Sequence, residues 1–320
     1  MKQENRRMLA VTALYALIPL LLALVPELLA GVEMEAYGWG YSLYMVLMEF
    51  GVIVLPAFIW ILTRKGREDM GGIWLKKPTA AILIMIPLAL SAYFCMNGVS
   101  LIWLAVLEAF GLQQVPQNVP IPQNAAQLAV SVAVVAMCPA VCEEFFFRGV
   151  LQPVLHKHWK PWIAILVGGC MFGMVHGQLA ALPAHVLLGM GICLVAYWTK
   201  SIWYTALWHV IQNATAVLLA YLTNLMPVQE DAAAASADIL QQPEMLLIMG
   251  GMMTIFFGIG MAIWLFVLFM ATRRQRAAAA LAVEEQPAPK LWAYAPLLAA
   301  VGCIVYFYAT EIKLWLGGGI

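Results

Sequence analysis

Six polar side chains lie in one stretch of otherwise apolar sequence, and the glutamates and histidines among them could carry acid–base chemistry. They are Glu143, Glu144, Arg148, His176, His209 and Asn213. Two pairs stand four residues apart, Glu144 with Arg148 and His209 with Asn213, and residues at that spacing share one face of an α-helix. The sequence therefore predicts helices that present these groups to a common site.

The two adjacent glutamates are predicted to differ in role. Glu144 precedes Arg148 by one helical turn, which is the favourable order for an ion pair, and we interpret this pair as a structural support. Glu143 lies about 100° around the helix and has no such partner. A carboxylate without a cation in apolar surroundings can take up and release protons, so Glu143 is the candidate general base. A role of both glutamates in helix packing is the alternative.

The two histidines add further polar groups to this constellation. His176 follows Phe172 by one turn, although a single histidine in a span can equally bond one helix to another. His209 and Asn213 aim an imidazole and a carboxamide at one point, and such a pair can stabilise an oxyanion or hold an ordered water. Glu49 stands apart in another apolar run, and His185 is expected at the surface.

The elements that position these residues are predicted to be transmembrane helices. Of 320 residues, 64% are apolar and only 11% are charged, with a mean hydropathy of +0.86. Soluble domains are typically about 45–50% apolar and about 25% charged. The net charge is zero, which gives no support for a nucleic-acid partner. We predict an all-α, polytopic transmembrane bundle of eight to nine spans whose surroundings are a lipid bilayer.

Apolar runs give nine candidate spans and three parts of the chain. The spans are 8–30, 38–62, 79–110, 125–148, 161–180, 182–199, 201–225, 244–271 and 291–316. Residues 1–124 hold spans one to three, 125–225 form the core of spans four to seven, and 226–320 hold the last two spans with short linkers. Residues 149–160 are expected along the membrane interface. With these boundaries Glu143 lies about 7 Å and His176 about 22 Å from the same membrane face, so a common site requires span five to bend, tilt or start deeper.

The charges predict the orientation of the chain. Nine alternating spans with a cytosolic N-terminus place 16 of the 17 Lys and Arg residues on the cytosolic side, leaving Lys313 outside. The outer loops then hold Glu33, Glu35, Glu230, Asp231 and Asp238. By the positive-inside rule, the sequence predicts a multi-pass protein of the cell membrane with a cytosolic N-terminus.

The polar motifs resemble those of a known family. Glu143-Glu144-x-x-x-Arg148, Phe172-x-x-x-His176 and His209-x-x-x-Asn213 are similar in order and spacing to the three motifs of the CPBP intramembrane proteases. That family includes the CAAX prenyl proteases and proteins linked to bacteriocin processing or self-immunity. The resemblance covers about residues 125–225. It implies an endopeptidase that hydrolyses a peptide bond of a membrane-associated protein or peptide near the cytosolic leaflet.

The resemblance also implies roles for individual residues. Glu143 and His176 would hold and activate the attacking water, and His209 with Asn213 would stabilise the oxyanion. Glu144, Arg148 and Phe172 would support the site.

Two alternatives stay open. Glu143, His176 and His209 could bind a divalent metal such as Zn or Mn, but no His-Glu-x-x-His motif is present, and hydrolysis without a metal is the preferred interpretation. The other is a non-proteolytic membrane protein on the same scaffold, either a bacteriocin-immunity or regulatory factor or a transporter.

Overall fold

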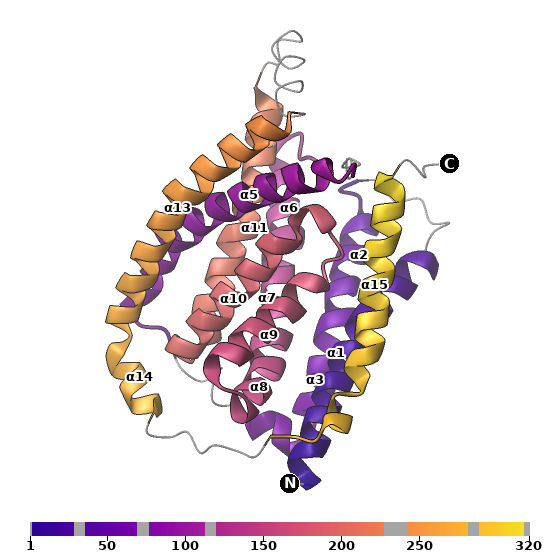
Figure 1. The fold of residues 1–320 in the computed structure, drawn as a ribbon, viewed down its shortest axis with the longest axis vertical. Helices are drawn as coiled ribbons and strands as arrows, with labels where there is room; N and C mark the ends of the chain where they lie inside the picture. Colours follow the sequence, from indigo (N-terminus) through magenta and orange to yellow (C-terminus); the bar gives the residue numbers. More distant parts are fainter. Residues whose placement is uncertain are drawn as a thin grey trace.

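The computed structural model describes residues 2–28, 36–68, 77–112, 120–226, 242–280 and 288–316. These residues form helices and no β-strand (Figure 1), which confirms the predicted all-α class. Within the part of the chain that the structure describes, seven helical segments are long and apolar enough to cross a membrane: Lys2–Val25, Gly40–Ile61, Ala80–Ala109, Ala125–His158, Leu179–Thr199, Pro243–Ala271 and Leu291–Trp315. The chain is therefore a multi-pass membrane bundle.

The helical elements follow one another closely along the chain. In order they are α1 (Lys2–Leu28), α2 (Trp39–Met48), η1 (Glu49–Val54), α3 (Leu55–Ile61), η2 (Ala80–Ile84), α5 (Met85–Ala109), α6 (Ala125–Ser131), η3 (Val132–Met137), α7 (Cys138–Phe146), η4 (Phe147–Leu151), α8 (Gln152–His158), α9 (Pro161–Met174), η5 (Leu179–Ala181), α10 (Leu182–Thr199), α11 (Ile202–Leu225), α13 (Pro243–Ala271), α14 (Arg273–Ala280), η6 (Leu291–Tyr294) and α15 (Pro296–Trp315). Helices α7, α9, α10 and α11 lie in the middle of Figure 1, between the pair α5 and α13 and the pair α1 and α15.

Two predicted spans are not among the seven apolar segments. Span five is α9, which has only 14 residues and a length of about 21 Å. Span seven is α11, which is long enough at 24 residues but carries the polar residues of the candidate site. Both helices pack against neighbouring helices inside the bundle, where they need less apolar surface than a lipid-facing helix.

The structure corrects the predicted end of span four. The helix does not stop at Arg148 with an interfacial segment after it, but continues through η4 and α8 to His158. Nε2 of His158 lies 3.3 Å from Oε2 of Glu4, so α8 ends beside the start of α1. Glu143 is then 15 residues from this end, about 22 Å, which matches the depth of His176 along α9. The predicted mismatch in depth disappears.

Three segments of the bundle, η1, η3 and η4, are π-helical turns, and a proline follows each of them. Pro56, Pro139 and Pro153 are the second residues of α3, α7 and α8. A proline has no N–H to donate, and its ring clashes with the carbonyl four residues earlier. The preceding turn widens as a result. Helix α7, which carries Glu143 and Glu144, has such a turn at each end, and π-turns are frequent at functional sites.

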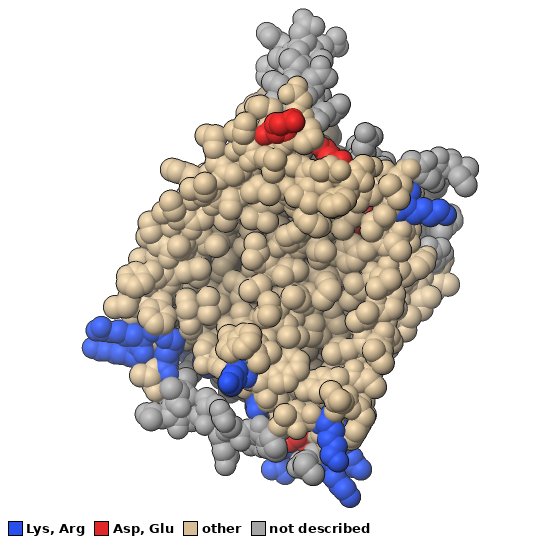
Figure 2. Space-filling model, viewed as in Figure 1, with Lys and Arg blue, Asp and Glu red and all other residues tan. Residues whose placement is uncertain are grey.

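Charged residues gather toward the two ends of the bundle. Figure 2 shows Lys and Arg gathered mainly at the end that holds the N-terminus in Figure 1, whereas acidic side chains are visible at both ends. We call the end that holds the N-terminus the basic end and the opposite end the far end. The start of α1 and the end of α15 lie toward opposite ends of the bundle (Figure 1), as an odd number of crossings requires. The predicted outer-loop residues Glu33, Glu35, Glu230, Asp231 and Asp238 lie outside the described residues.

Candidate active site

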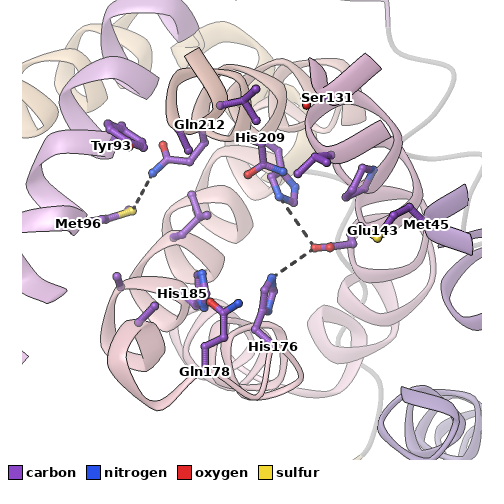
Figure 3. Close-up of a pocket in the computed structure, with 18 of the residues that line it drawn as sticks. Met45, Tyr93, Met96, Ser131, Glu143, His176, Gln178, His185, His209 and Gln212 are labelled. Carbon is purple, nitrogen blue, oxygen red and sulfur yellow. Dashed lines mark hydrogen bonds and ion pairs between the residues drawn. The ribbon is translucent and has the colours of Figure 1, made fainter. Parts of the chain in front are cut away.

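Three helical segments bring Glu143, His176 and His209 together inside the bundle (Figure 3). Oε2 of Glu143, on α7, lies 3.9 Å from Nε2 of His176 and 3.9 Å from Nε2 of His209. His209 belongs to α11, and His176 follows the last turn of α9. Gly177 has a φ of +62°, a conformation that glycine adopts without strain, and it turns the chain directly after His176. The sequence therefore places this imidazole at the tip of a helical hairpin.

A hydrogen bond to the backbone determines which nitrogen of the His176 ring carries the proton. Its Nδ1 lies 2.9 Å from the carbonyl oxygen of Phe172, and because a carbonyl only accepts, Nδ1 carries the proton. In the neutral ring, Nε2 then presents a lone pair toward Glu143. This arrangement can hold a water molecule between an imidazole acceptor and a carboxylate.

Glu144 and Arg148 form the predicted ion pair and also orient His209. Nε of Arg148 lies 3.1 Å from Oε2 of Glu144, and both side chains are fully buried. The other oxygen, Oε1, lies 3.2 Å from Nδ1 of His209. An oxygen of a carboxylate paired with arginine acts as an acceptor, so Nδ1 of His209 donates and Nε2 faces Glu143. The ion pair thus acts on the site indirectly, because Glu144 orients the ring of His209.

Phe172 is the packing centre around which these polar groups are arranged. It is fully buried, and the guanidinium carbon of Arg148 lies 4.6 Å from its ring centroid, within the range of a cation–π interaction. Its ring centroid lies 4.9 Å from that of His176 and 5.6 Å from that of His209. The ring of Phe172 therefore packs against the guanidinium of the ion pair and against both imidazoles, and so helps to set their positions.

A cavity of about 850 Å³ lies beside Glu143 and the two histidines, a volume within the range of small-molecule binding sites. Glu143, His176, His209 and Asn213 all line it. From Glu143 the cavity extends toward the far end: its walls include residues 120–122, which precede α6, and Ala220, near the end of α11. Ile121 is 46% exposed, so part of the cavity wall on that side lies at the protein surface.

Several lining residues were not predicted as part of the site. His185 was expected at the surface, but it lines the cavity, and its ring centroid lies 4.3 Å from that of His176. Gln212 is buried and donates to the sulfur of Met96 at 3.7 Å (Figure 3). Glu49 joins the same cavity from η1. The only sequence signal for them was a polar residue within an apolar run.

Glu143, His176 and His209, the residues named as a possible metal site, stand wider apart here than ligands around a bound zinc ion. Two donors on a tetrahedral zinc ion, each about 2.0–2.1 Å from the metal, are about 3.3–3.4 Å apart, whereas Glu143 is 3.9 Å from each histidine nitrogen. Within the described part of the chain, no group of three or more His, Cys, Asp or Glu residues could hold a metal ion.

The fold and the site define a class: an all-α, multi-pass membrane protein with glutamate and histidine at a cavity inside the bundle. Residues 125–215 match the protein family described as Rce1-like, type II CAAX prenyl endopeptidase Rce1-like. This match confirms the resemblance to CAAX proteases that the motifs indicated, and it contains all three motifs. No curated protein and no solved structure matches the chain.

Proposed function

We propose that the chain is an intramembrane endopeptidase that hydrolyses a peptide bond of a membrane-associated protein or peptide. The observation that carries the proposal is the position of Glu143, whose carboxylate faces two imidazole nitrogens at 3.9 Å in a cavity inside the bundle. The match of residues 125–215 to a CAAX endopeptidase family supports the same reaction class.

Glu143 acts as the general base in this proposal. A water molecule held between Glu143 and Nε2 of His176 gives a proton to the carboxylate as its oxygen attacks the scissile carbonyl carbon. The protonated Glu143 then returns that proton to the leaving amine as the C–N bond breaks. General acid–base catalysis of this kind contributes about 100- to 10,000-fold to the rate.

His209 and Asn213 stabilise the oxyanion of the tetrahedral intermediate. With Nδ1 donating to Glu144, Nε2 of His209 donates to the substrate oxygen only when the ring is protonated, and carboxylates lie on both sides of that ring. Asn213, one turn further along α11, lines the same cavity and offers an amide N–H. Arg148 supports this step indirectly because it holds Glu144 in place.

The cavity bears on where in the membrane cleavage takes place. The charge distribution supports a cytosolic basic end and N-terminus. The sequence predicted cleavage near the cytosolic leaflet, but the cavity extends from Glu143 toward the far end. We therefore propose that the substrate enters from the far end, and that hydrolysis takes place near the middle of the membrane.

The experiment that tests the function compares membrane proteins from cells that express the native chain with those from cells that express Glu143→Gln. Quantitative sequencing of new protein N-termini should detect cleavage products that depend on the native chain and vanish in the variant, while both proteins reach the membrane in equal amounts. Identical sets of N-termini would contradict the proposal and favour the non-proteolytic immunity factor or transporter.

A further inference from the structure

Glu49 lines the same cavity as Glu143 but comes from a different part of the bundle. It begins η1, the π-turn before Pro56, and η1 packs against α7. Met45 and Met48, which precede it, also line the cavity. Glu49 and Glu143 therefore face one common space.

Glu49 differs from the other glutamates of the site in having no partner within the described residues. Glu144 is paired with Arg148, and Glu143 faces two imidazoles. Oε2 of Glu49 is buried and accepts no hydrogen bond. The described residues that line the cavity include neither Lys nor Arg. Among these described lining residues, no Lys or Arg side chain therefore pairs with Glu49.

An unpaired carboxylate within a membrane-spanning segment is costly and usually marks function. The cost falls when a cation arrives, because buried charges are tolerated when they are paired. Residues 120–122, Glu49 and Glu143 all line this one cavity. A substrate bound there would bring its own groups beside Glu49.

We propose that Glu49 is a specificity residue that binds a cationic group of the substrate, an ammonium or guanidinium close to the scissile bond. This inference rests on the proposed peptidase function. A Lys or Arg side chain and a free N-terminal amine share this chemistry. The apolar remainder of the cavity wall, including Met45 and Met48, accommodates the rest of the peptide.

The test uses the full-length protein in lipid vesicles and a host peptide taken from a cleavage product that depends on Glu143. Peptide variants carry Lys, Arg, Gln or Met at each position near the scissile bond, with a free or an acetylated N-terminus. For the native chain, Lys or Arg at one position, or the free amine, should raise kcat/KM at least about 10-fold over the neutral peptide. In Glu49→Gln this ratio should fall toward one, whereas Glu244→Gln, an exposed glutamate outside the cavity, should keep it.

Three results separate the possible failures. Equal cleavage of cationic and neutral peptides by the native chain would overturn the inference about Glu49 and leave the peptidase function intact. An equal loss of kcat for all peptides in Glu49→Gln, with the ratio unchanged, would also overturn it, because Glu49 would then act on the chemistry and not on specificity. If no peptide were cleaved in a way that depends on Glu143, both proposals would be overturned.

Discussion

Replacing Arg148 with alanine should destabilise the protein strongly, because the change leaves a carboxylate buried without its cation. Both side chains of the Glu144–Arg148 pair are fully buried, and the guanidinium also contacts the ring of Phe172. Breaking a buried pair by removing one partner costs about 3–5 kcal/mol, which changes the unfolding equilibrium by a factor of about 100 to 4,000. Equilibrium unfolding in detergent, followed by proteolysis of the unfolded fraction, measures this change.

The chain provides a matched control for that measurement. Arg64 and Glu68 also stand four residues apart and form an ion pair, with N and O atoms 3.1 Å apart, but their side chains are 87% and 45% exposed. Surface pairs contribute little, so Arg64→Ala should leave stability unchanged. The double change Glu144→Gln/Arg148→Gln should recover part of the loss, because it removes both charges. If Arg148→Ala unfolded no more readily than Arg64→Ala, the pair would not be the internal support inferred here.

Other predictions concern helix packing, topology and the oxyanion. A Cβ at Gly173 would lie 2.5 Å from the backbone nitrogen of Val186, whereas a Cβ at Gly302 would meet nothing within 4 Å; Gly173→Ala should therefore lower the unfolding temperature and Gly302→Ala should not, and equal values would refute the close α9–α10 contact. Tyr15→Phe removes the hydrogen bond to the carbonyl oxygen of Met171 and should lower the free energy of unfolding by about 1 kcal/mol in the same assay. An unchanged free energy of unfolding would contradict this contact between α1 and α9. Reporter fusions at the two termini should report opposite sides of the membrane, and the same side for both would contradict an odd number of crossings. Asn213→Ala should retain about 1% or less of native kcat, since one oxyanion donor contributes about 100- to 1,000-fold; near-native kcat would remove Asn213 from the mechanism.

The parts of the site that depend on local helical spacing could be predicted from the sequence. Glu144 and Arg148 form a pair because residues four apart on a helix face each other, and no other part of the fold is needed for that prediction. The fold class followed from composition because a chain with so few charges cannot cover a water-exposed surface.

Features that depend on contacts between distant elements could not be predicted. The sequence predicted that span four ends at Arg148, because a charged residue usually marks the end of a span. The helix continues to His158 because Glu144 neutralises Arg148 inside the bundle, and the sequence did not reveal that this pair is buried. The same limit applies to His185 and Glu49, which reach the cavity through the hairpin of α9 and α10 and through the packing of η1 against α7. The widened turns before Pro139 and Pro153 change the direction of side chains in ways that a regular helical period does not describe.

The most direct test of the mechanism is the cleavage rate of the purified, vesicle-reconstituted protein with Glu143 as its only changed residue. Glu143→Gln keeps the size of the side chain but cannot take a proton from water, so cleavage should fall by at least about 100-fold, while the unfolding temperature stays near the native value. Glu244→Gln, the matched change outside the cavity, should cleave at the native rate. A Glu143→Gln protein that cleaved substrate at a near-native rate would contradict the assignment of Glu143 as the general base.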